Sequence, residues 1–245
     1  MDWLSFIETS RQFLDRDREG SLVPLVEAVD ELYRIAPEKV PFGRGIEADW
    51  FTKCFFLCHR GLLSAAMIMA SGSPEDGEVI TRRALEVAQT CLAIKVDRKN
   101  LDLWLSTELR QKRWQQRGKK QKPDFLSVKF KVHGEPLYEG LGAEIGALSD
   151  FAVHFTPEFF GRYEWEKKPG PESGTEYYFG LREGDIEKGF LRLCRHHVLI
   201  VRAFDRCQDG KLLHHPEVKQ AFEYVNALHE RFRQTLLTTL TGKHE

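Results

Sequence analysis

Residues 47–96 read EADWFTKCFFLCHRGLLSAAMIMASGSPEDGEVITRRALEVAQTCLAIKV, and this stretch decides the fold class. Apolar residues recur every three or four positions on both sides of residues 71–76, which is the spacing of buried positions on α-helices. Between them, Ser73 is suited to cap a helix and Pro74 to occupy its first position, while the two following acids favour the positive end of the helix dipole. The stretch therefore predicts two long helices, over about 47–70 and 74–96.

The helix over 47–70 is apolar on most of its sides, which is typical of a helix surrounded by protein. We therefore expect it to lie at the centre of the fold. The apolar positions on which this expectation depends are Trp50, Phe51, Cys54, Phe55, Leu62 and Met69.

The helical period continues outward in both directions, and proline, glycine and capping residues divide it. Further helices are predicted over about 2–17, from Ser21 to near Pro37, from Asp97 to near Gly118, and over about 136–155, 185–207 and 216–240. Gly140, Gly142 and Gly146 weaken the helix over 136–155, so either a neighbour approaches it closely or it is broken there. The expected fold is an all-α bundle of seven or eight helices in a single domain, residues 1–245.

Two segments have a β pattern instead. Val128, Phe130 and Val132 alternate with lysines, as in a short strand. Residues 162–166 and 175–181 are rich in aromatic residues and flank a segment rich in proline and glycine, which predicts a small β-hairpin over about 161–183.

Composition limits the class of protein. The 245 residues are 42% hydrophobic and 30% charged, with a formal net charge of −1. The longest apolar run, residues 62–70, is shorter than the roughly 20 residues that span a bilayer, and the first ten residues lack the features of a signal peptide. An odd number of cysteines, five, argues against a disulfide framework. These features predict a cytoplasmic protein with no membrane association.

Cys54, Cys58 and His59 are spaced like one corner of a metal site, but no second pair of ligands completes it. We interpret the two cysteines as small apolar residues on one helix face, and we expect no metal or cofactor. The sequence also lacks the glycine-rich motifs of nucleotide-binding proteins and the Gly-x-Ser-x-Gly motif of serine hydrolases.

Charge is segregated along the chain. Seven basic residues and no acid lie between residues 110 and 122, whereas acids outnumber bases by twelve to four over residues 134–187. The basic run predicts a phosphate or nucleic-acid contact, with the tryptophan stacking on a base, or simply a solvated helix end. Docking on the acidic half of a second protomer is a third interpretation. The candidate contact residues are Arg110, Lys112, Arg113, Trp114, Arg117, Lys119 and Lys120.

Two sets of residues resemble a group of bacterial helical proteins of unknown function. Residues 80–86, with Arg82 and Glu86 four positions apart, resemble the group's Arg-x-x-x-Glu helix, and residues 137–141 with Ser149 and His154 resemble its later helix. The resemblance covers about residues 50–160. It implies that Arg82, Glu86 and His154 converge, and these three residues are a candidate polar pocket.

Arg192 and His197 are spaced as in the helical ribonucleases of the HEPN type. In those enzymes the histidine acts in acid–base cleavage of RNA and the arginine stabilises phosphate charge, so the resemblance implies a metal-independent ribonuclease with this pair as its catalytic residues. His197 also aligns with Phe190, Cys194 and Val201 on one helix face, which predicts a packed core histidine instead.

The sequence thus favours a non-catalytic helical protein that acts by binding a partner or a ligand. It is also compatible with a homo-oligomer. The basis is a rich helical core without a concentrated set of titratable groups. The HEPN-like ribonuclease is the alternative.

Overall fold

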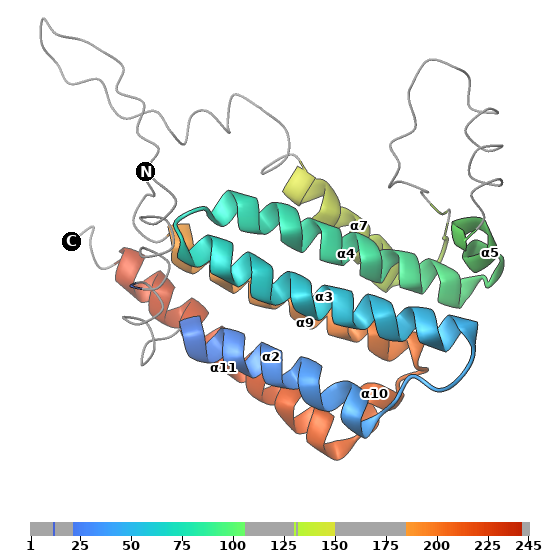
Figure 1. Cartoon of the computed structure of the whole chain (residues 1–245). Coiled ribbons are helices and arrows are strands. Elements are labelled where there is room, and N and C mark those ends of the chain that lie inside the picture. Colours follow the sequence, from blue (N-terminus) through green and yellow to red (C-terminus); the bar gives the residue numbers. More distant parts are fainter. Residues whose placement is uncertain (1–11, 13–21, 106–129, 131, 150–184, 242–245) are drawn as a thin grey trace, which may run out of the picture.

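The computed structural model describes residues 22–105, 132–149 and 185–241, together with Gln12 and Phe130. These ranges contain eight helices and no strand, which confirms the all-α prediction for them (Figure 1). The predicted helix over 2–17 and the predicted hairpin over 161–183 lie outside the described residues. The helices are α2 (Leu22–Lys39), α3 (Ile46–Ala70), α4 (Pro74–Val96), α5 (Lys99–Leu105), α7 (Pro136–Leu148), α9 (Asp185–Cys207), α10 (Lys211–His214) and α11 (Pro216–Thr241).

The long helices form two layers. In Figure 1, α2, α3 and α4 run side by side in the front layer, and α11, α9 and α7 lie behind them. Helix α9 contacts α2, α3, α4, α7 and α11. Twelve of its 23 residues are buried, against eight of the 25 in α3, so α9 is the central helix. The prediction that α3 is central was wrong, because one side of α3 packs on α9 and the other faces outward.

The connection from α3 to α4 forms where the sequence predicts it, but by different contacts. Ser73 precedes α4 and makes no side-chain capping bond. The Ser71 hydroxyl instead donates to the Ile68 carbonyl at 2.6 Å, and Gly72 takes a φ of 94° that favours glycine. Beyond this turn the two helices approach closely at Gly77, where an added Cβ would lie 2.5 Å from the Met69 Cγ and 3.0 Å from the Ala65 carbonyl oxygen.

Aromatic rings fill the middle of the core, between the two layers. The Phe55 ring lies 4.8 Å from Tyr33 and 5.1 Å from Phe204, measured between centroids, and it meets Phe204 edge-on. Such tilted and edge-on pairs are the favoured geometries for aromatic side chains. They join α2, α3 and α9 into one packed unit.

Most of the predicted strand near residue 130 lies outside the described residues, which include only Phe130 and Val132 of it. Phe130 and Val132 have no regular secondary structure, although both are buried against Ala93. Both side chains pack on α4. The Tyr138 hydroxyl donates to the Phe130 carbonyl at 2.7 Å and holds this segment against α7.

The glycines of α7 do not break it between residues 136 and 148. A close neighbour is found only at Gly142, where an added Cβ would lie 2.9 Å from the amide nitrogen of Gln89. That amide donates to the Tyr138 carbonyl at 3.1 Å and links α4 to α7. Gly140 and Gly146 have open space beside them.

Among the described residues, α3 is the one helix that is long and apolar enough to cross a membrane by length and composition. The longest near-continuous apolar run within this helix, residues 62–70, is shorter than the helix itself. In the structure, 39% of the apolar window of α3 is buried against other helices. The core helix of a water-soluble bundle meets the same criterion, so this feature is weak evidence for a membrane span.

Candidate functional site

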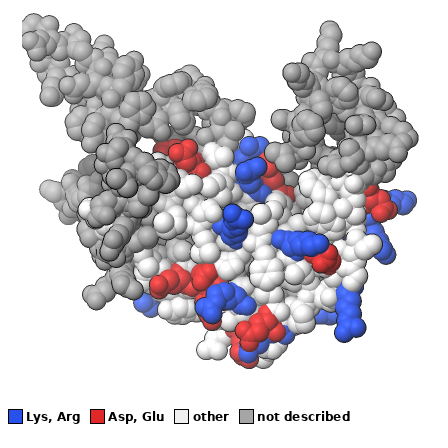
Figure 2. All heavy atoms as spheres, viewed as in Figure 1, with Lys and Arg blue, Asp and Glu red and all other residues white. Residues whose placement is uncertain are grey.

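The outward face of α3 carries a row of exposed apolar side chains. Phe56, Leu57, Leu63 and Met67 are each between 43% and 54% exposed, and Ile46 at the start of the helix is 65% exposed. Their spacing places them on one side of α3, opposite the face that packs on α9. We call these five residues the α3 ridge. In Figure 2, which faces the same layer, uncharged surface extends across the middle of the molecule between scattered charged groups.

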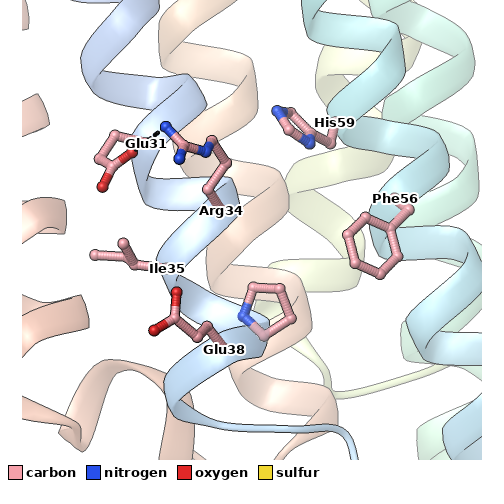
Figure 3. A pocket seen from close by; sticks show the side chains of 7 residues that line it. Glu31, Arg34, Ile35, Glu38, Phe56 and His59 are labelled. Atoms are coloured by element: carbon pink, nitrogen blue, oxygen red, sulfur yellow. Dashed lines mark hydrogen bonds and ion pairs between the residues drawn. The ribbon is translucent and has the colours of Figure 1, made fainter.

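A groove of about 440 Å³ runs beside the α3 ridge, between α2 and α3. Figure 3 shows Arg34, Ile35 and Glu38 of α2 on one side and Phe56 and His59 of α3 on the other. Because Phe56 belongs to both the ridge and the groove, the two form one continuous surface. The groove is open to solvent and has mixed polarity, with an ion pair of 2.8 Å between Arg34 and Glu31 on its wall.

A chain of polar contacts leads from this groove into the core. The His59 Nε2 lies 2.5 Å from the Asp30 carboxylate, and the His59 ring stacks on Tyr33 with centroids 5.1 Å apart. The Tyr33 hydroxyl lies 2.9 Å from the Nδ1 of His197. Burial raises the pKa of Tyr33 well above its usual value and lowers the pKa of His197 to about 3, so both groups are neutral near pH 7.

The structure does not bring Arg192 and His197 together. Both lie on α9, five positions apart, which turns their side chains about 140° from one another. Arg192 Nε donates to the carboxylate of buried Glu78 on α4 at 2.6 Å, whereas the fully buried His197 contacts Tyr33 on α2. The burial confirms the prediction of a packed core histidine, and a buried neutral imidazole cannot reach a phosphodiester at the surface.

The neighbouring histidine of α9 makes a second polar cluster. His196 Nε2 lies 3.0 Å from a Glu144 carboxylate oxygen of α7, and Arg195 pairs with the same carboxylate. Burial is the largest influence on His196 and lowers its pKa despite the nearby acid. Sequence reasoning missed this cluster and the Glu78 ion pair, because their members are more than 50 positions apart in the chain.

Arg82 and Glu86 pair with one another along α4 at 2.9 Å, and both side chains are about one-third exposed. His154 lies outside the described residues, so the predicted convergence of these three residues stays a prediction. The same holds for the predicted phosphate contact, since all seven of its residues fall within 106–129.

The cysteines have ordinary packing roles in this structure. Four of the five are buried, and the Cys58 thiol donates to the Ala84 carbonyl at 3.4 Å. Burial raises the pKa of Cys58, which keeps it as a thiol. Within the described residues no group of three or more histidine, cysteine, aspartate or glutamate side chains is placed to hold a metal ion.

No protein-family model, curated protein or solved structure matches this chain. Functional inference therefore rests on the chain's own residues, among which the α3 ridge and the adjoining groove form the candidate site.

Proposed function

We propose that this protein is a helical binding protein that recognises a partner polypeptide through the α3 ridge. The observation that carries the proposal is the row of exposed apolar side chains on one face of α3. Isolated exposed apolar residues are common on proteins, but several large ones on one helix face, even with Lys53 and Arg60 between them, favour an interaction surface. Each such side chain contributes about 1.5–3 kcal/mol when fully buried, before the cost of ordering the two partners.

The surroundings of the α3 ridge support a protein partner. Two of the charged groups near it are paired: Lys53 with Asp49 at 2.6 Å and Arg34 with Glu31 at 2.8 Å. Protein interfaces commonly combine apolar side chains with charged and polar groups. The adjoining groove adds a hollow that can receive a side chain from the partner.

The titratable groups of the core support binding over catalysis. His197 is buried and neutral, Arg192 is engaged by Glu78, and His196 is held by Glu144. A general acid or base must reach its substrate within hydrogen-bonding distance, and His197 and Arg192 point to different helices of the bundle. Beyond the spacing of Arg192 and His197, nothing in the described residues favours the ribonuclease alternative.

Site-specific photo-crosslinking in living cells tests the proposal. The photoreactive amino acid p-benzoylphenylalanine is placed at Phe56, which preserves an aromatic ring at this position. The matched control is the same replacement at Tyr224 on α11, whose exposure of 58% is close to the 50% of Phe56. We expect polypeptide adducts from position 56 that disappear when Leu57→Asp is added to the same chain. The absence of adducts, or equal adducts from position 224, would show that the α3 ridge is not an interface.

A further inference from the structure

We infer that Cys54 of α3 and Cys91 of α4 are a redox-active pair, which hydrogen peroxide converts into a reversible disulfide between the two helices. The inference goes beyond the proposed binding function and does not depend on the α3 ridge. Three observations carry it. The two positions face one another, their thiols are hydrogen-bonded, and one of the two is open to solvent while the other is buried.

The packing register of α3 against α4 places Cys54 opposite Cys91. The two helices lie side by side and run antiparallel, joined by a short turn (Figure 1). At Gly61 an added Cβ would lie 3.5 Å from the Cβ of Ala84, so these two positions face one another. Cys54 lies seven residues before Gly61 along α3, and Cys91 lies seven residues after Ala84 along α4. Because seven residues are nearly two full turns of an α-helix, the two cysteines lie on the same facing sides of the helices.

The two thiols are also in contact. The Cys91 thiol donates a hydrogen bond to the Cys54 sulfur. A disulfide requires Cβ atoms about 3.5–4.5 Å apart, and the facing positions Gly61 and Ala84 of the same helix pair meet this requirement. The helices are therefore close enough at these cysteines for their sulfur atoms to form a bond.

The two cysteines differ in exposure and in pKa. Cys54 is partly exposed, whereas Cys91 is 1% exposed. The hydrogen bond from Cys91 lowers the pKa of Cys54, while burial raises the pKa of Cys91 well above its usual value. The thiolate is the nucleophilic form of cysteine. Cys54 is therefore the residue that peroxide reaches and oxidises first, and Cys91 is the residue that completes the disulfide.

The reaction has two steps. The Cys54 thiolate attacks one oxygen of hydrogen peroxide, the O–O bond breaks, and the departing hydroxide takes up the proton that Cys54 lost, which leaves a sulfenic acid and one water. The Cys91 sulfur then attacks the Cys54 sulfur, the S–O bond breaks as the S–S bond forms, and the Cys91 proton leaves with the hydroxide as a second water. Two thiols thus lose two electrons to one peroxide. A dithiol reductant restores both thiols by exchange.

The neighbouring cysteines are placed differently. Cys58 lies one turn from Cys54 along α3, but it is fully buried and its thiol donates to the Ala84 carbonyl at 3.4 Å. Cys207 of α9 lies within electrostatic reach of Cys54, but it is 4% exposed and burial raises its pKa. We expect both to remain thiols. A disulfide in a reducing compartment is typically transient, which fits a single reversible pair in this chain.

Thiol titration of the purified full-length chain tests the pair. The chain is treated with a small excess of hydrogen peroxide, the peroxide is removed with catalase, and free thiols are counted after unfolding. Because two of the five thiols are consumed, we expect the count to fall from five to three and to return to five after dithiothreitol. Cys54→Ser should keep its four remaining thiols. The matched control Cys58→Ser, one turn away on the same helix, should fall from four to two.

Tryptic mapping of the oxidised wild-type chain identifies the bonded residues without any variant. Residues 54–60 and 84–95 form separate tryptic peptides, and Cys207 lies in a third, residues 207–211. We expect the first two peptides to be linked, with fragmentation placing the bond at Cys54 and not at Cys58. An unchanged thiol count, a bond from Cys54 to Cys207, or a bond between two chains would overturn the inference. None of these outcomes affects the proposed binding function of the α3 ridge.

Discussion

The Tyr33 hydroxyl meets the Nδ1 of His197 at 2.9 Å, deep between α2 and α9, and the two rings lie nearly edge-on. Both side chains are fully buried. This contact provides a polar partner to a tyrosine and a histidine that would otherwise lie unpaired in an apolar core. Because a hydrogen bond has a preferred direction, this contact favours one rotation of α2 against the central helix.

The first prediction concerns acid stability. The folded pKa of His197, about 3, lies below that of an unfolded histidine, about 6.5. As pH falls through this window the unfolded chain takes up a proton that the folded chain does not, so the free energy of unfolding falls by about 1.4 kcal/mol per pH unit. His197→Gln should reduce this slope. Urea denaturation at pH 4–7 measures it, with exposed His214→Gln as the control; equal slopes in wild type and His197→Gln would contradict the assignment.

The second prediction concerns the ion pair between Arg192 and Glu78. The Glu78 side chain is 2% exposed, so Arg192→Met leaves a buried carboxylate without this partner. We expect a loss of about 3–5 kcal/mol in the free energy of unfolding. Arg192→Met combined with Glu78→Gln removes both charges, and it should be more stable than Arg192→Met alone. Additive losses in the double-mutant cycle would show that the pair is not coupled.

The third prediction compares two helical glycines. Gly77→Ala forces a Cβ against Met69 and the Ala65 carbonyl, and we expect it to destabilise the fold by about 1–3 kcal/mol. Gly140→Ala has open space and should stabilise the protein by about 0.4–1 kcal/mol, because alanine restricts the unfolded chain. Thermal unfolding of the two variants checks both signs. A stabilised Gly77→Ala would mean that α3 and α4 are less closely packed than described.

The fourth prediction addresses the ribonuclease alternative. Incubation with structured RNA should leave the RNA intact, both with the wild-type chain and with His197→Ala, since His197 is fully buried and Arg192 is paired with Glu78. Gel electrophoresis of the RNA measures the outcome. Cleavage by the wild type that is lost in His197→Ala would restore the enzymatic interpretation.

Sequence alone predicted the helix boundaries well where local chemistry sets them. Pro74 and Pro216 each begin a helix in the structure, as predicted. The Asp97 carboxylate accepts the Lys99 backbone N–H at 3.0 Å, which is the expected cap at the start of α5. Proline and capping residues act within one turn of the chain, so their effect does not depend on the tertiary fold.

The candidate site could not be predicted in the same way. Apolar content along α3 shows that much of the helix avoids water, but it does not show which side another helix covers. The exposed side of α3 follows from the tertiary structure, because α9 covers the opposite side. Glu78 and Arg192 lie 114 positions apart, and no local pattern in either segment indicates that they meet.

The central position of α9 has a consequence for synthesis of the protein on the ribosome. Helix α4, the last of α2, α3 and α4 along the chain, ends at Val96. The helix that covers the inner faces of these three, α9, is complete only at Cys207. At about 5–20 residues per second, translation of the intervening 111 residues takes about 6–22 s. For that interval the nascent chain presents three uncovered apolar surfaces, so chaperone protection of the emerging polypeptide would be needed until α9 arrives.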